Sequence, residues 1–137
     1  MYFYAVKSTI SYFTMSELNE VFGKIKEILK KYEPPFGHKI DSNTGYDLWS
    51  FRAVEMSGRK YPELYFGGIT LRGKYVSLYN MAIYIHKELL ADLSPALKKK
   101  LSGKSCFHLT EVDNTMLTEI ETLYDKAYQF YKDSGWI

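Results

Sequence analysis

The end of the chain carries the pattern that most restricts its fold. Between residues 115 and 134, apolar side chains recur every three or four positions, which is the spacing of one face of an α-helix. Gly135 follows, and glycine commonly ends a helix because it readily adopts the left-handed backbone conformation. A long helix with one apolar face needs a surface to cover, so the rest of the chain must supply that surface.

A second amphipathic helix is predicted over residues 15–32. Thr14 and Glu17 have the spacing of a capping box, in which the side chain of each satisfies a backbone amide of the other. Phe13 and Leu18 are placed to add a hydrophobic contact across this cap. A Pro-Pro pair then ends the helix, because proline lacks an amide donor and disfavours helical geometry in the residue before it.

The middle of the chain has the composition of three β-strands, over residues 46–55, 63–71 and 74–85. Short connections that contain glycine separate them, and such connections favour an antiparallel meander.

A short helix and a fourth strand follow the meander. Ser94 and Pro95 suit the cap and the first position of the helix, and Gly103 is predicted to end it. The fourth strand is predicted over residues 104–110 and leads into the last helix.

Together these elements predict a single α+β domain over residues 1–137. We expect two layers, with a mainly antiparallel four-stranded sheet and the N- and C-terminal helices packed on one of its faces. A chain of 137 residues with 46% hydrophobic residues can bury a core without disulfides or a bound metal.

Cysteine content, hydropathy and charge restrict the cellular setting and the partners. The lone Cys106 has no second cysteine for an internal disulfide, so a reducing, cytoplasmic location is predicted. No apolar run approaches the roughly 20 residues that cross a bilayer, so no membrane partner is expected. The net charge of +2 is too small to favour nucleic acid as a partner.

Four short motifs stand out when they are taken together: Tyr75-Val-Ser-Leu-Tyr79, Leu93-Ser-Pro-Ala-Leu-Lys-Lys-Lys-Leu101, Gly103-Lys-Ser-Cys-Phe-His108 and Gly135-Trp-Ile137. They resemble motifs of the YdhG-like domain family, and the resemblance runs from about residue 16 to the end of the chain. It implies a compact α+β domain whose general activity is undefined. Some members of that family have been linked to intracellular iron handling, so the resemblance also implies iron as a candidate ligand.

Alternation along the strands predicts a polar aromatic surface, because residues two apart lie on the same face of a strand. A patch of aromatic and a few polar groups is the usual form of a ligand site. Aromatic residues, which make up 17% of this chain, are also enriched at homodimer interfaces. The candidate ligand-binding residues are Tyr65, Tyr75, Ser77, Tyr79, Lys104 and His108.

These observations predict a non-enzymatic binding domain that forms a homodimer through this aromatic face. A small-molecule ligand in the same place is the other occupant that we consider. No catalytic residue, no metal ligand and no cofactor is assigned.

Two further functions stay open at this point. Glu121 and Asp125 share a face of the last helix, and carboxylate oxygens suit iron, so intracellular iron binding is the first alternative. Cys106 and His108 are two residues apart on a strand, so their side chains share a face. That spacing permits a thiol-dependent enzyme, the second alternative.

Overall fold

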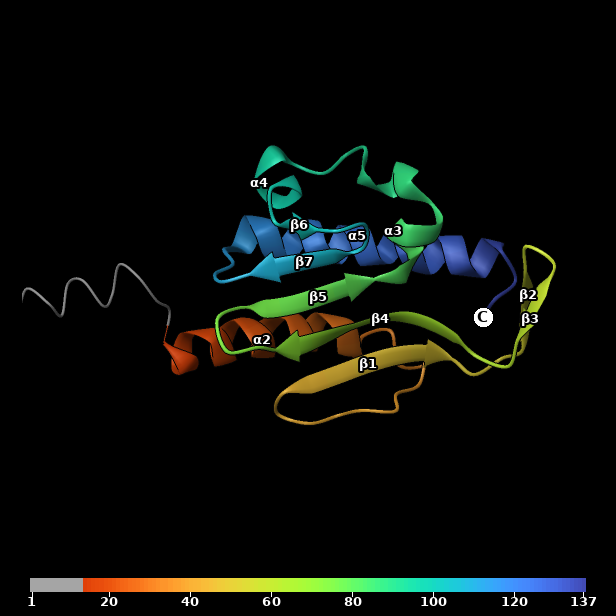
Figure 1. Ribbon diagram of the computed structural model, residues 1–137, viewed down its shortest axis with the longest axis horizontal. Helices are drawn as coiled ribbons and strands as arrows, with labels where there is room; N and C mark the ends of the chain where they lie inside the picture. The colour runs from red at the N-terminus through yellow and green to blue at the C-terminus, as the bar shows by residue number, and fades with distance from the viewer. Residues whose placement is uncertain (1–13) are drawn as a thin grey trace, which may run out of the picture.

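A computed structural model describes residues 14–137 of the chain (Figure 1). Five strands form an antiparallel sheet in the order β1-β4-β5-β7-β6. They are β1 (Gly45–Ser50), β4 (Leu64–Leu71), β5 (Val76–Asn80), β6 (Leu101–Ser102) and β7 (Cys106–Leu109). The predicted α+β class is confirmed. The sheet has one strand more than predicted, because β6 pairs with the outer edge of β7.

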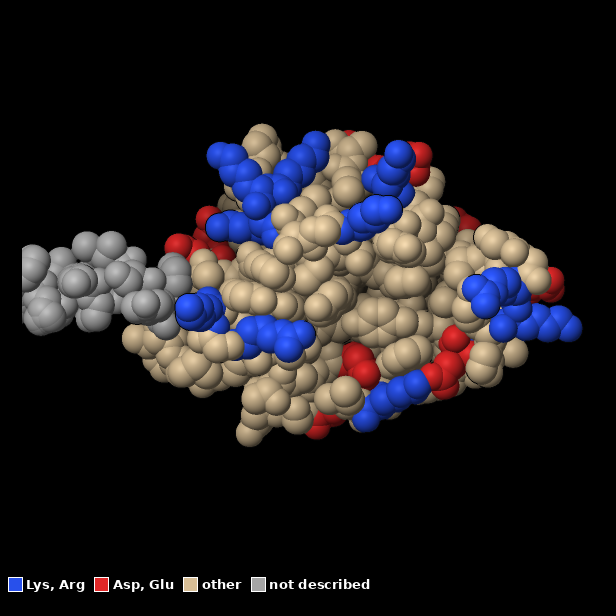
Figure 2. All heavy atoms as spheres, in the orientation of Figure 1, with Lys and Arg blue, Asp and Glu red and all other residues tan. Residues whose placement is uncertain are grey.

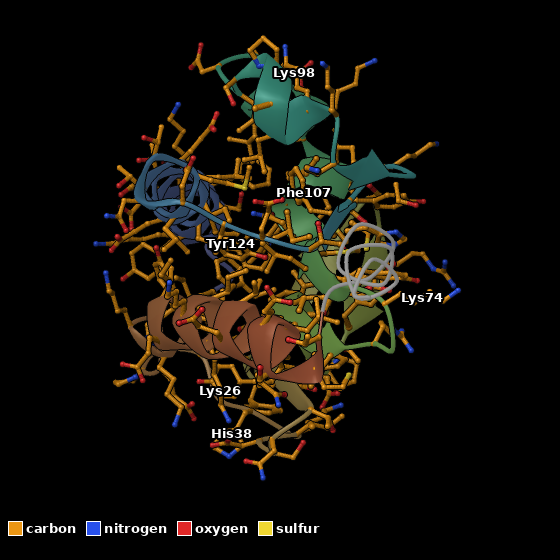
Figure 3. The ribbon with its side chains drawn as sticks, turned by 90° about the vertical axis from the view of Figure 1, so that its left-hand side faces the viewer. Lys26, His38, Lys74, Lys98, Phe107 and Tyr124 are labelled. Atoms are coloured by element: carbon orange, nitrogen blue, oxygen red, sulfur yellow. The ribbon has the colours of Figure 1, made fainter. Side chains whose placement is uncertain are left out.

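Two long helices, α2 (Met15–Lys30) and α5 (Asn114–Asp133), cover the same face of this sheet (Figures 1 and 3). Their buried side chains follow the predicted helical stripes, as Ile25 and Leu29 on α2 and Ile120 and Leu123 on α5 show. In Figure 3, Phe107 of β7 and Tyr124 of α5 lie in the layer between sheet and helices. The two-layer arrangement is therefore the predicted one.

The start of α2 and the end of α5 are built by the residues that the sequence indicated, whereas α2 ends at Lys30, two residues before the predicted end. The Thr14 amide donates to Glu17 Oε1 at 2.7 Å, and the Glu17 amide donates to Thr14 Oγ1 at 3.1 Å. Gly135 has a φ of 78°, and the Trp136 amide donates to the Tyr131 carbonyl at 3.0 Å. These bonds are a capping box on α2 and a Schellman motif on α5. The predicted contact of Phe13 lies outside the described residues.

The third predicted strand, 74–85, is wrong beyond residue 80. The Asn80 side chain accepts a hydrogen bond from the Ile83 amide at 3.3 Å and thereby caps α3 (Met81–Ile85). A 3-10 helix, η1 (Lys87–Leu90), follows. Residues 81–85 therefore continue the chain as helix, because a polar cap interrupts the ladder where the strand would go on.

The first predicted strand is also too long. It ends at Ser50, and a separate hairpin made of β2 (Val54–Met56) and β3 (Arg59–Tyr61) follows it.

The predicted role of Gly103 and the start of the fourth strand are corrected as well. The short helix α4 (Pro95–Lys98) begins at the predicted Ser94 cap but ends before β6. Gly103, with a φ of 79°, lies in the turn between β6 and β7. Lys104 belongs to the same turn, since β7 begins at Cys106.

An aromatic cluster occupies the core beside the helices. The rings of Phe36 and Phe66 stack with their centroids 4.0 Å apart, and Tyr32, Tyr124 and Tyr131 surround Phe66 at 5.0 to 6.0 Å. Leu48 pairs with Gly67 and Trp49 with Tyr65, so Phe66 is the extra residue of a β-bulge.

Within residues 14–137, no helix combines the length and the apolar character needed to cross a membrane.

Candidate functional site

The face of the sheet opposite α2 and α5 is turned toward the viewer in Figure 1, and no described element packs over its centre. Paired residues of neighbouring strands share a face, so Ser77 and His108 lie together, as do Tyr79 and Cys106. We call this surface the open face. Its side chains are Asp47, Trp49, Tyr65, Thr70, Tyr75, Ser77, Tyr79, Cys106 and His108.

Trp49 anchors the β1 side of the open face. Its indole meets the Tyr65 ring edge to face, with centroids 5.1 Å apart, and its Nε1 donates to Asp47 Oδ2 at 3.0 Å. The Lys39 ammonium lies 3.8 Å from the indole centroid and forms an ion pair with Glu63. The amide of Lys39 also donates to Asp47 Oδ1 at 2.8 Å. The indole is therefore held in one orientation by a charge, a carboxylate and a second ring.

Tyr65 lies flat across the sheet beside Trp49. A β carbon on Gly68 would come within 2.8 Å of the Tyr65 hydroxyl, so the glycine makes room for the phenol. Burial, and then the nearby Asp47 carboxylate, raise the pKa of Tyr65 above the ordinary 10.0. The Tyr65 hydroxyl thus stays neutral at physiological pH.

The β7 side of the open face is built from a second ring pair. The rings of Tyr75 and His108 stack with centroids 4.0 Å apart and planes 21° from parallel. Cys106 is only 7% exposed, and its Sγ lies 3.8 Å from the Phe107 carbonyl oxygen. Tyr79 stands half-buried on the central strand between the two ring pairs.

The backbone beneath the open face is held from the opposite side by α5. The Tyr131 hydroxyl donates to the Tyr65 carbonyl at 2.6 Å, and the Tyr124 hydroxyl donates to the Tyr79 carbonyl. Burial raises the pKa of both donors, so neither phenol loses its proton near neutral pH. Two of the three tyrosines of the open face, Tyr65 and Tyr79, are therefore fixed at their backbones by two tyrosines of the core.

The structure brings together five of the six residues predicted for the site. Tyr65, Tyr75, Tyr79 and His108 lie on the open face. Ser77 shares this face through its pairing with His108, but it is only 1% exposed, so neighbouring side chains cover it. The sixth residue, Lys104, does not lie on the open face, because its backbone belongs to the β6–β7 turn. Its ammonium lies 5.9 Å from the centroid of the Tyr84 ring on α3.

Sequence reasoning missed Trp49, Lys39 and Asp47. The two β1 residues were detectable, because alternation along the predicted strand 46–55 places Asp47 and Trp49 together, on the face opposite Tyr46 and Leu48. Lys39 comes from the loop before β1, and nothing in its sequence neighbourhood indicates the contact with Trp49.

Charge is distributed unevenly around the open face (Figure 2). Lysine and arginine side chains gather over α4 and along the α3–η1 edge, whereas several acidic side chains lie along β1. The centre consists of uncharged groups. The open face is therefore an aromatic surface with one basic side and one more acidic side.

The carboxylates considered for iron have protein partners. Glu121 forms an ion pair with Lys31, and Asp125 Oδ1 accepts the Tyr32 hydroxyl at 2.6 Å. In the part of the chain that the structure describes, no three His, Cys, Asp or Glu side chains converge as a metal site would require.

The pair considered for thiol chemistry shares the open face as expected. The His108 ring, however, stacks on the Tyr75 ring, and Cys106 is only 7% exposed. A substrate would therefore have little access to the thiol.

Comparisons of the chain with protein-family models, with curated proteins and with solved structures found no match. The likeness to the YdhG-like domain family therefore stays a prediction. The geometry of the open face carries the functional argument.

Proposed function

We propose that this chain is a non-catalytic binding domain that forms a homodimer by packing two open faces against each other. The observation that carries the proposal is an uncharged aromatic surface at the centre of a sheet face that no described element covers. Sheets usually bury both faces when both carry large aromatic groups, and a second sheet is one of the standard ways to do so. Trp49, Tyr65 and Tyr79 would supply the contact.

The uneven charge favours one arrangement of the two copies. A two-fold axis that runs parallel to the strands, over the central strand β5, places β1 of one copy opposite β7 and β6 of the other. The acidic side of one open face then meets the basic side of its partner, which favours this pairing electrostatically. Tyr79, on β5, lies close to this axis and faces the Tyr79 of the second copy.

The size of the open face predicts a weak dimer. Four strands about 4.8 Å apart, with five residues each spaced about 3.3 Å, span roughly 20 Å by 17 Å. Two such faces together would bury roughly 700 Å², which is less than the roughly 1,000 Å² of a stable specific interface, so we expect a transient dimer with a dissociation constant on the order of 100 µM.

Sedimentation velocity over a protein concentration of about 1 to 500 µM tests the proposal, since this range brackets the expected dissociation constant. The Tyr79→Lys variant should remain monomeric, because it places two ammonium groups near the two-fold axis. Met15→Lys is the matched control: Met15 is 52% exposed and begins α2, on the opposite side of the sheet. It should dimerise like the unmodified chain.

Two results would overturn the proposal. One is an unmodified chain that stays monomeric over the whole concentration range. The other is a dimer that Tyr79→Lys and Met15→Lys weaken to the same extent, because that dimer would use another surface.

A further inference from the structure

A cavity of about 570 Å³ lies beside the open face, between α3, η1 and the β6–β7 turn. Its apolar lining comes from Ile83, Ile85 and Leu90. Small-molecule sites commonly measure about 300 to 1,000 Å³ and combine apolar walls with a few polar groups. The cavity has the size and the kind of lining that such a ligand needs.

An exposed aromatic ring forms part of the lining. Tyr84 is 58% exposed, although its helix neighbours Ala82 and Ile83 are buried. The helix α3 thus holds its backbone against the core and presents the phenol ring to the cavity. A flat ligand ring can stack on it, and such aromatic pairs contribute to binding beyond the area that they bury.

Two lysines give the cavity its charge. The Lys104 ammonium lies 5.9 Å from the Tyr84 ring centroid, and Lys87 lines the cavity from η1. Glu88 also lines it, but its carboxylate lies 3.1 Å from His86 Nδ1 and is engaged there. The cavity opens on the side of the molecule where lysine and arginine gather in Figure 2. An anionic group is therefore favoured over a cationic one.

The turn between β6 and β7 leaves one wall open. A β carbon on Gly103 would have no atom within 4 Å, and its positive φ of 79° is a conformation that other residues rarely adopt. A ligand can therefore come close to the backbone beside Lys104.

We propose that this cavity binds a small planar aromatic carboxylate. The ring of the ligand stacks on Tyr84 against the wall formed by Ile83 and Leu90. The carboxylate is held by Lys87 and Lys104. None of its lining residues belongs to the open face, so binding does not require dimer formation, although the site lies on the basic side that meets the partner in the proposed dimer.

Titration of the ¹⁵N-labelled full chain with naphthalene-2-carboxylate, followed by amide NMR shifts, tests the proposal. A ligand of this size is expected to bind with a dissociation constant of about 1 mM. The shifts should centre on Tyr84, Lys87, Gly103 and Lys104. The cationic analogue naphthalen-2-ylmethylamine has the same ring and should bind more weakly.

Variants of two exposed residues separate the two parts of the recognition. Lys104→Ala should weaken binding about two- to fivefold, the size of one solvent-exposed ion pair. Lys99→Ala is the matched control, since Lys99 is an exposed lysine after α4 that does not line the cavity. Tyr84→Ala should also weaken binding, whereas Tyr84→Phe should retain it because the ring remains.

Three results would overturn the assignment. The first is equal binding of the carboxylate and the amine. The second is a set of shifts centred on Trp49 and Tyr79 of the open face. The third is an unchanged affinity in Lys104→Ala when the amide spectrum shows that this variant is folded.

Discussion

The Tyr124 hydroxyl of α5 donates a hydrogen bond to the backbone carbonyl of Tyr79, at the end of β5. Gly67, on the neighbouring strand, leaves the room for this contact. A β carbon at position 67 would lie 2.6 Å from the Tyr79 carbonyl oxygen and 3.0 Å from the Tyr124 ring. A residue at the centre of the open face is therefore positioned by a helix on the opposite side of the sheet.

Removal of the Tyr124 hydroxyl should destabilise the fold. In Tyr124→Phe the ring packing is retained, but the hydrogen bond from the core to the Tyr79 carbonyl is lost. We expect the free energy of unfolding to fall by about 1 to 3 kcal/mol in urea unfolding measurements. Tyr84→Phe removes a hydroxyl from a ring that is 58% exposed and should change the same quantity by less than about 0.5 kcal/mol. Equal effects of the two variants would show that the hydrogen bond contributes nothing measurable.

Two glycine-to-alanine substitutions should change the free energy of unfolding in opposite directions. Gly67→Ala forces a methyl group against backbone and ring and should destabilise the fold by about 1 to 3 kcal/mol. Gly23→Ala, inside α2, meets no atom within 4 Å and should stabilise the fold by about 0.5 to 1 kcal/mol, because alanine is the better helix former. Thermal unfolding of the two variants measures the difference. A Gly67→Ala variant as stable as Gly23→Ala would contradict the close packing around Tyr124.

Stability should decline in alkaline solution. Burial raises the pKa of Tyr124 and Tyr131 above the ordinary 10.0, so the folded chain keeps protons that the unfolded chain releases. The stabilisation is complete below about pH 10 and is lost as the pH rises further, because folding then requires these phenols to take up protons.

Urea unfolding between about pH 9 and pH 11 measures this decline. Each of these two buried phenols should add a slope of up to about 1.4 kcal/mol per pH unit above about pH 10. Tyr131→Phe should therefore show a shallower decline than the unmodified chain. A Tyr131→Phe variant whose stability declines as steeply with pH as that of the unmodified chain would contradict the burial of this ring.

Cys106 should react slowly with a thiol reagent. It is 7% exposed and lies within the sheet, so the reagent reaches it only when the strand opens. The labelling rate at neutral pH should be below that of free cysteine and should rise in urea. Labelling faster than free cysteine would instead support the thiol-dependent enzyme considered from the sequence.

Local patterns predicted most of the elements but not all of their ends. The capping box at Thr14 and the Schellman glycine at 135 were predictable, because each depends on residues a few positions apart. The end of β5 was not. The short apolar run after Asn80 suits a strand as well as a helix, and periodicity does not separate the two over five residues. The Asn80 cap and the packing against α5 stabilise these residues as a helix instead of a strand.

The candidate site was predicted in part for a similar reason. Alternation placed Ser77, Tyr79 and His108 on one face, since the period of a strand is two residues wherever it lies. The prediction extended the strand through Lys104, where the alternation no longer applies because the chain turns at Gly103. Trp49 joined the site through the pairing of β1 with β4, a contact between segments distant in the sequence.

By itself, the sequence determined the α+β class, the two amphipathic helices and the alternation that gives the strands a polar aromatic face. These properties follow from the order of neighbouring residues. Only the tertiary structure decided the fifth strand, the bulge at Phe66 that leaves Tyr65 opposite Trp49, and the turn that carries Lys104 to Tyr84. Register and bulges depend on which strands meet and how they pack, so no local pattern specifies them.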